Sequence, residues 1–200
     1  MIEPPGSKAW LALHVEPVLD PDRPIIDPHH HLWRRHNHNY LLEDFWDDTQ
    51  TGHRIEKTVF VECHAAYRQD GPEQLRSLGE TQFAAEQAEQ SEHQAKRATI
   101  AGIVGHVDLR LAENIIPILQ MHIELAGGRF KGIRHAGARA IDPDGMTIIG
   151  KAPEGLYEDR KYRTGLRILG DMNLSFDTWH YHYQNDNFRD LAAACPDTET

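Results

Sequence analysis

Five short apolar segments recur along the chain, and each has the length of a buried strand. The clearest is Lys57-Thr-Val-Phe-Val-Glu-Cys63, in which β-branched and aromatic residues predominate, as they do in strands generally. The five expected strands cover residues 24–27, 57–63, 99–107, 130–134 and 174–179.

Helical patterns separate these strands. Residues 73–97 are rich in Ala, Gln and Glu and have a thin apolar stripe, so we expect a long helix that buries one narrow face and leaves a charged face to solvent. Residues 113–126 have Pro117 near the start and Gly127-Gly128 after the end, the usual asymmetry of a helix. A shorter helix is predicted over 162–171.

Strands that alternate with helices predict a parallel sheet built from βα units. A closed (β/α)8 barrel needs eight such units and about 250 residues, whereas residues 24–200 supply five. The expected fold is therefore α/β, a TIM (β/α)8-type barrel that is incomplete. The Pro-rich and acidic residues 1–23 are predicted to form an N-terminal tail.

Composition narrows the class of protein. The chain has 21 Lys and Arg against 31 Asp and Glu, a net charge of −10, which argues against nucleic-acid or anionic-membrane partners. Its two cysteines form no CxxC motif, so a disulfide framework is not expected. We find no secretory signal and no apolar stretch of membrane-spanning length, which predicts a cytoplasmic protein.

Histidine is unusually frequent, with 14 in the chain, five of them between positions 29 and 38. In a strand, alternate side chains share a face, so His29 and His31 should point together and His30 the other way. Two converging imidazoles form a good half of a zinc site. The spacing alone leaves open a histidine-rich surface loop or an unrelated metal-scavenging tract.

The segment Ile25-Ile-Asp-Pro-His-His-His-Leu-Trp33 resembles the Asp-x-His-x-His signature of the amidohydrolase superfamily. It is closer to the amidohydrolase-related (amidohydrolase 2) branch, which holds lactonases, dicarboxylate-lactone hydrolases and some decarboxylases. Residues 58–63, 129–135 and 174–182 fit the same branch in the same order, so the resemblance covers about 25–185.

The resemblance implies a barrel whose site lies at the carboxyl ends of the strands, with His29 and His31 as metal ligands and catalytic groups. The implied activity is water attack on the carbonyl of a small lactone or carboxylated metabolite, with a divalent metal, zinc first, as Lewis acid. Some members of the branch work without metal. A later-strand histidine and a last-strand aspartate complete the site in full-length relatives, and neither can be assigned in this chain.

Four further residues are predicted to bind substrate: Arg134, His135, His180 and Glu62. Arg134 and His135 end the fourth strand, where a guanidinium fork could hold the acid group and either residue could hold a ring oxygen. An ion pair within the barrel is the equal alternative for Arg134. His180 and His182 share a face if the fifth strand continues that far, and His182 is also predicted as a catalytic proton carrier; packed histidines at a strand end remain the alternative.

Glu62 ends the second strand and is predicted to accept the ring N–H of a histidine near the substrate. A Cys63–His64 nucleophile pair is disfavoured, because adjacent residues on a strand point to opposite faces. His106 and Asp108 are more simply structural than part of the cavity. Residues 136–156 are expected to be irregular, as a substrate-covering loop or a tolerated insertion.

Two alternatives stand beside the hydrolase. One is a non-oxidative decarboxylase of the same superfamily. The other is a catalytically inactive fragment, because an open barrel leaves sheet edges unpaired and favours association with a partner or a second copy. A histidine-rich metal-storage module ranks last, since it does not explain the ordered alternation of strands and helices.

Overall fold

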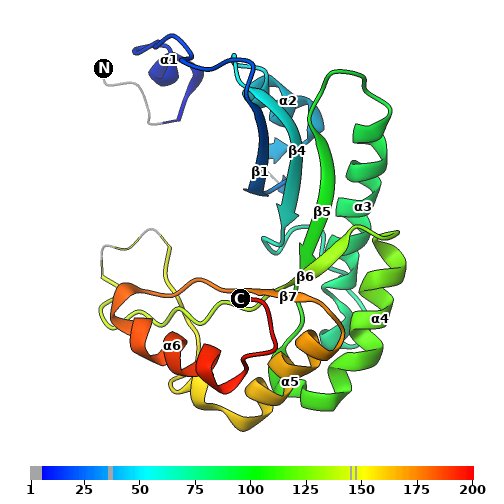
Figure 1. Cartoon of the computed structure of the whole chain (residues 1–200), viewed down its shortest axis with the longest axis vertical. Coiled ribbons are helices and arrows are strands. Elements are labelled where there is room, and N and C mark those ends of the chain that lie inside the picture. The colour runs from blue at the N-terminus through cyan, green and yellow to red at the C-terminus, as the bar shows by residue number, and fades with distance from the viewer. Residues whose placement is uncertain (1–5, 36–37, 145, 147) are drawn as a thin grey trace.

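The computed structural model describes residues 6–35, 38–144, 146 and 148–200. Its main sheet is built from β1 (Pro24–His30), β4 (Arg54–Val61), β5 (Thr99–Gly105), β6 (Phe130–Arg134) and β7 (Ser175–Asp177). These strands pair in parallel in the order β1-β4-β5-β6-β7. Figure 1 shows the sheet curling into an open C, with β1 and β7 at its two ends. The chain is therefore an α/β half-barrel, as the alternating pattern predicts.

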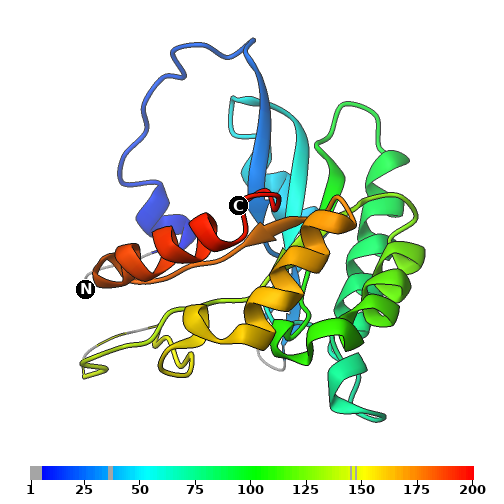
Figure 2. The same ribbon diagram turned by 60° about the horizontal axis from the view of Figure 1, so that its bottom comes forward.

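The remaining elements are α1 (Lys8–Leu11), the hairpin of β2 (Trp33–Arg35) and β3 (His38–Tyr40), α2 (Leu42–Thr49), α3 (Leu78–Glu92), α4 (Ile115–Leu125), α5 (Arg160–Asp171) and α6 (Asn185–Ala194). Helices α3, α4 and α5 cover the outer side of the curled sheet, and the turned view in Figure 2 shows them there again. No described helix is long and apolar enough to cross a membrane.

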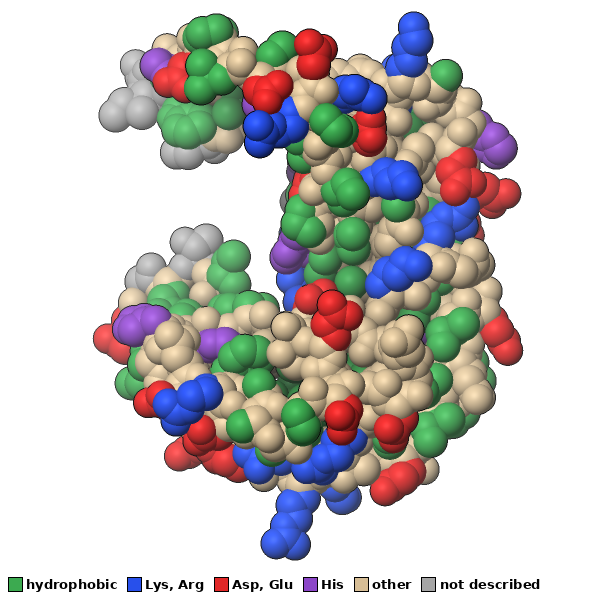
Figure 3. All heavy atoms as spheres, in the orientation of Figure 1, with side chains coloured by type: hydrophobic (Ala, Val, Ile, Leu, Met, Phe, Trp, Pro, Cys, Tyr) green, Lys and Arg blue, Asp and Glu red, His purple; other side chains and the backbone are tan. Residues whose placement is uncertain are grey.

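The core lies between the outer face of the sheet and the helices. Phe60 and Ile103 are neighbours in the β4–β5 register, Ile133 and Phe176 in the β6–β7 register, and all four are almost fully buried. Each such side chain contributes about 1.5–3 kcal/mol of burial free energy. The opposite face is open: Ile26 on β1 is 65% exposed, and Figure 3 shows hydrophobic side chains facing the hollow of the C.

The long helix predicted over 73–97 is shorter in the structure. Residues 73–75 form a single 3-10 turn, and α3 occupies only Leu78–Glu92. At its start Gly79 packs so closely on the preceding loop that an added Cβ would lie 2.5 Å from the carbonyl oxygen of Ala66. At its end Lys96 adopts φ +69°, which turns the chain toward β5.

Two other boundaries also differ from the sequence pattern. The 3-10 segment Leu109–Asn114 precedes α4, and β7 ends at Asp177, two residues short of the predicted limit. Beyond Asp177 the segments that follow β6 and β7 stay linked, because the Thr178 hydroxyl donates to the carbonyl oxygen of His135 at 3.1 Å and the N–H of Gly137 donates to the carbonyl oxygen of Trp179 at 3.2 Å. The β2–β3 hairpin, α2 and α6 were not predicted at all.

Candidate active site

The three consecutive histidines at the end of β1 alternate in direction. His29 Nε2 and His31 Nε2 lie 3.2 Å apart, with the two rings at 85° to each other. His30 points to the outer side, where it pairs in register with Phe60 and stacks on Phe45 of α2 at 4.4 Å. Burial lowers the pKa of His30 to about 4, so it packs as a neutral ring. The predicted convergence of His29 and His31 is therefore observed.

His31 is prepared to offer a lone pair. Its Nδ1–H donates to the carbonyl oxygen of Val61 at 2.7 Å, which leaves Nε2 without a proton in the neutral ring. Burial lowers the pKa of His31 and favours that neutral form. In a tetrahedral zinc site with Zn–N bonds of 2.0–2.1 Å, two ligand nitrogens lie about 3.3 Å apart.

The observed separation of 3.2 Å therefore fits two ligands of one zinc ion. Among the described residues no group of three or more His, Cys, Asp or Glu side chains has the geometry to hold a metal. The histidine pair thus fits as half of a metal site.

Glu62, next to the end of β4, is the centre of the charged groups. Arg134 Nε donates to Glu62 Oε1 at 2.8 Å, and a terminal nitrogen of Arg134 donates to the Glu62 carbonyl oxygen. His64 Nδ1–H donates to Glu62 Oε2 at 3.0 Å. Burial alone would raise the pKa of this carboxyl, but the hydrogen bond from His64 and the charge of Arg134 outweigh it and bring the pKa of Glu62 to about 2. Glu62 is therefore a carboxylate with both oxygens engaged.

This arrangement bears on two predictions from the sequence. Glu62 accepts a histidine ring N–H, and that histidine is His64. Arg134 forms the ion pair that was the alternative to substrate binding. Its guanidinium has five N–H donors, of which two form hydrogen bonds to described residues. A substrate-binding role for Arg134 stays a prediction.

Cys63 takes no part in a nucleophile pair with His64. Its Sγ lies 3.6 Å from the carbonyl oxygen of Leu32, while the His64 ring turns to Glu62. Burial raises the pKa of the Cys63 thiol to about 12, so it is protonated at neutral pH. These contacts agree with the sequence analysis, which disfavoured a Cys63–His64 nucleophile pair.

Two more histidines follow β5 and β6. His106 Nδ1–H donates to the carbonyl oxygen of Arg134 at 2.8 Å, and its ring lies 5.2 Å from that of His135. His135 Nδ1 accepts the backbone N–H of Leu109 at 3.2 Å. Burial, and next the neighbouring His106, lower the pKa of His135 to about 4. His135 is therefore neutral at pH 7 with its proton on Nε2.

A pocket of about 580 Å³ opens between the loops that follow β4, β5 and β6, and we call it the histidine pocket. Small-molecule sites occupy about 300–1,000 Å³. Its lining includes His64, Tyr67, His106, Asp108, Arg110 and His135. His106 and Asp108, which the sequence favoured as structural, thus also face a cavity.

Asp177 is the last residue of β7, so it lies at the carboxyl edge of the sheet, where β1, β4, β5 and β6 also end. We call this curved edge the arc of strand ends. Burial raises the pKa of its carboxyl, while the charges of Arg134 and His29 oppose the rise. The sequence analysis gave this residue no role, although an acid directly after a short apolar run is the signal that could have found it. The arc therefore runs from His29 across the sheet to Asp177.

His180 and His182 lie beyond β7 rather than on it. His180 Nε2 lies 3.2 Å from Asn185 Oδ1, and its ring packs 4.9 Å from that of Phe188. His182 is exposed and begins the 3-10 segment His182–Gln184. Because the strand has ended, the condition under which the two histidines would share a strand face is not met. Their roles in binding and proton transfer stay predictions.

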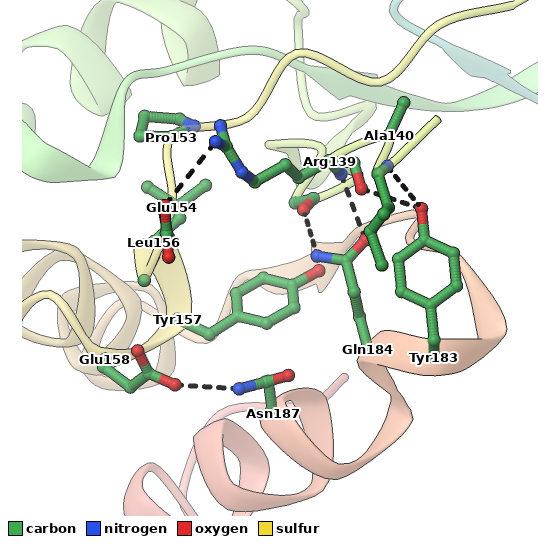
Figure 4. A pocket seen from close by; sticks show the side chains of 13 residues that line it. Arg139, Ala140, Pro153, Glu154, Leu156, Tyr157, Glu158, Tyr183, Gln184 and Asn187 are labelled. Atoms are coloured by element: carbon green, nitrogen blue, oxygen red, sulfur yellow. Dashed lines mark hydrogen bonds and ion pairs between the residues drawn. The ribbon is translucent and has the colours of Figure 1, made fainter. Parts of the chain in front are cut away.

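The irregular loop over 136–156 is tied to the segment after β7. The N–H of Ile141 donates to the Tyr183 hydroxyl at 3.2 Å, and the N–H of Gly150 donates to the Tyr181 hydroxyl at 3.0 Å. A pocket of about 550 Å³ lies beside these contacts, and its polar side chains are largely paired with one another, as Arg139 with Glu154 and Asn187 with Glu158 (Figure 4). The loop is therefore anchored at several points.

No protein-family model matches the chain. It is 27% identical over 200 residues to y4mH, an uncharacterized protein of Sinorhizobium fredii (strain NBRC 101917 / NGR234), in a match that covers 89% of this chain and 61% of that protein.

The structure is similar to a crystal structure of an amidohydrolase from Burkholderia multivorans with bound zinc, at TM-score 0.60 and 20% identity. The chain therefore shares the fold of part of that TIM barrel. A crystal structure of the Burkholderia amidohydrolase with bound HEPES, in another space group, gives TM-score 0.53 at the same identity. Both similarities cover 86% of this chain and 54% of the other, so the chain spans little more than half the length of these relatives.

Glu80 on α3 is a buried acid that the sequence analysis placed on a solvated helix. Its Oε1 accepts two backbone N–H groups, whereas no hydrogen-bond partner reaches Oε2 among the described residues. Burial raises the pKa of Glu80 to about 7, against the effect of the two N–H groups. No periodicity could reveal it, because the residues that enclose Glu80 come from another segment.

Glu80 should make stability fall as pH rises. The folded state holds the proton up to about pH 7, whereas the unfolded chain releases it near 4.5. The stabilisation is therefore complete below pH 4.5 and is lost as pH approaches 7, by roughly 3 kcal/mol. Urea unfolding of the native protein and of Glu80→Gln at pH 4.5 and 7.5 measures this, and the difference between the two proteins should change by that amount. Parallel pH profiles would contradict the prediction.

Proposed function

We propose that this chain supplies the first-strand part of a hydrolase site in which water attacks the carbonyl carbon of a small lactone or related carboxylated metabolite. The observation that carries the proposal is the 3.2 Å approach of His29 Nε2 and His31 Nε2 at the carboxyl end of β1. Barrel enzymes have their active sites at that end of the strands. The zinc bound to an amidohydrolase of the same fold supports this reading.

His29 and His31 would hold a divalent metal, zinc by preference, which would supply Lewis-acid activation of the carbonyl and a lowered pKa of bound water. The unused N–H donors of Arg134 are proposed to hold the substrate's carboxylate, because the guanidinium fork matches that group. His135, neutral with its proton on Nε2, is proposed to donate to a carbonyl or ring oxygen. His180 and His182 are proposed as further substrate-binding groups, with His182 also carrying protons.

We propose further that the partner is a small molecule met in the cytoplasm, with no nucleic acid or membrane surface involved. The net charge of −10 supports this, since like charges would repel both. The five strands of the main sheet leave the barrel open, so we propose that full activity requires polypeptide that closes it, from a longer chain, a partner or a second copy.

Zinc binding tests the histidine pair directly. Titration of the protein with zinc chloride, followed by calorimetry, should give one site, and His31→Ala should weaken it at least about 100-fold, since even groups that only orient metal ligands contribute 10- to 100-fold. His53→Ala, which removes an exposed histidine elsewhere, should leave the affinity unchanged. Equal affinities for all three proteins would overturn the proposed metal site.

The reaction class is tested on the zinc-loaded protein in a form whose barrel is closed, as a longer chain or with the partner or second copy that completes it. Proton release from small lactones such as δ-valerolactone is expected, whereas a decarboxylase would release CO2 from aromatic acids. CO2 release without lactone hydrolysis would replace the proposed hydrolase.

A further inference from the structure

One buried acidic side chain holds the backbone on both sides of His64. Glu80 Oε1 accepts the N–H of Cys63 at 2.9 Å and the N–H of Ala65 at 2.7 Å. Glu80 is 1% exposed and lies in the first turn of α3. The segment that carries His64 is therefore fixed to a helix of the outer layer.

The backbone of this segment is in a conformation that ordinary residues rarely adopt. His64 has φ +61° and Ala66 has φ +53°, both in the left-handed region. Such strain persists only where the surroundings impose it, and it gathers at functional sites. Here Glu80 and the close packing of Gly79 on Ala66 impose it.

The imidazole of His64 is oriented as firmly as its backbone. A carboxylate can only accept, so His64 Nδ1 carries the proton in its 3.0 Å hydrogen bond to Glu62. Glu62 is itself fixed by Arg134, at 2.8 Å. In the neutral ring Nε2 then holds a free lone pair, and it forms no hydrogen bond within the described part of the chain. The His64 side chain is 71% exposed and lines the histidine pocket.

His64 belongs to the same group of charges as the histidine pair. Glu62 and Arg134 both act on the ring of His31 and on that of His64. The carbonyl of Val61, which fixes His31, directly precedes Glu62 in the chain. The end of β4 that fixes His31 thus leads within three residues to His64, whose ring lies 5.9 Å from that of His106 in the histidine pocket.

We propose that His64 is a catalytic proton carrier of this hydrolase site, with Glu62 orienting its ring and Glu80 as a positioning residue. The proposal rests on the proposed function. His64 Nε2 takes a proton from the attacking water as the water oxygen bonds to the carbonyl carbon. When the carbon–oxygen bond to the leaving group breaks, the same proton passes from Nε2 to the departing alkoxide. One water is consumed, and the products are a carboxylic acid and an alcohol.

The groups around His64 set its pH dependence. The hydrogen bond to Glu62 has the largest effect and raises the pKa of His64, as does the charge of Glu80. Burial and the charge of Arg134 lower this pKa. The other charged or titratable groups that line the same pocket are Tyr67, Glu73, Arg76, His106, Asp108, Arg110 and His135. The ring of His64 therefore becomes mostly unprotonated only at a pH above the ordinary histidine pKa of about 6.5. Hydrolysis should rise with pH through a midpoint above that value.

His64→Asn is the decisive variant. Asparagine tolerates the left-handed conformation and can still donate an amide N–H to Glu62, but it has no basic nitrogen. In δ-valerolactone hydrolysis by the zinc-loaded protein, kcat should fall at least 100-fold and the rising limb of the pH profile should disappear. KM, Tm and zinc affinity should remain those of the native protein. His93→Asn, at an exposed position after α3, is the matched control and should change none of these.

Glu80 has its own test. Glu80→Ala should lower kcat about tenfold and move the pKa of His64, measured by NMR titration of its ring protons, toward 6.5. Glu80→Gln keeps an acceptor oxygen for the two N–H groups and should restore kcat, although it lacks the charge that raises the pKa of His64. A purely structural role would lower Tm in Glu80→Ala and leave the His64 titration unchanged.

The outcomes separate the two proposals. If the native protein binds zinc and hydrolyses the lactone while His64→Asn keeps the native kcat and pH profile, the role of His64 is overturned and the proposed function stands. If the protein with its barrel closed binds no zinc and hydrolyses no lactone, both are overturned.

Discussion

Glu62→Gln should lower the free energy of unfolding by about 3 kcal/mol. The Arg134 side chain is only 14% exposed, and its partner carboxylate 6%. Removing the negative charge leaves a guanidinium that has been taken out of water without compensation, and breaking a buried pair in this way typically costs 3–5 kcal/mol. Urea unfolding at pH 7 measures the change.

A surface pair in the same protein provides the control. Arg129 and Glu92 form an ion pair at 2.6 Å, but the Glu92 side chain is 53% exposed. Glu92→Gln should therefore cost less than about 1 kcal/mol. The double variant Glu62→Gln/Arg134→Met should recover part of the loss, because no buried charge remains unpaired. Equal losses for Glu62→Gln and Glu92→Gln would show that the central pair does not stabilise the fold.

Gly132→Ala should be the other strongly destabilising change, by about 3 kcal/mol. Gly132 is in the middle of β6 and pairs with Ser175 of β7. A Cβ at this position would lie 2.1 Å from the backbone carbonyl oxygen of Ser175, so the strands themselves would have to separate. Overpacking against rigid atoms typically costs 1–3 kcal/mol or more. The shift would also move Asp177, which shares β7.

Gly102→Ala is the matched change on the neighbouring strand β5. There the nearest atoms to an added Cβ are side-chain atoms, Lys131 Cγ at 3.2 Å and Val59 Cγ2 at 3.3 Å, which can move aside. Its effect on the free energy of unfolding should stay within about 1 kcal/mol, and the thermal midpoints of the two variants compare them. A Gly132→Ala protein as stable as Gly102→Ala would contradict the close approach of β6 and β7.

The local pattern of apolar and polar residues was enough to predict the main elements of the fold. All five sheet strands were predicted near their observed positions, because buried parallel strands are continuous apolar runs. The alternation of side chains along a strand also predicted how His29, His30 and His31 divide between the two faces, since that period depends on no other part of the chain.

The features that sequence missed depend on distant contacts. Glu80 looks like any acid on a solvated helix until the Cys63–Ala65 loop encloses it. α2 is held by Trp46, whose indole N–H donates to the Ala98 carbonyl at 3.0 Å, a contact between residues 52 positions apart. The position of His180 against Phe188 likewise follows from α6, which the pattern did not predict.

The alternation along β1 also has an evolutionary consequence. His30 is packed against Phe45 while its neighbours face the open side, so the two functions of this segment are separated only by the parity of position. The register of β1 against β4 shifts between Ile25 and Ile26 and again between Asp27 and His30, so an added residue before His29 can be absorbed as a bulge. A change of length between His29 and His31 has no such outlet, because it would turn one histidine of the pair toward the packed side. We therefore expect insertions and deletions to be tolerated before His29 and selected against between His29 and His31.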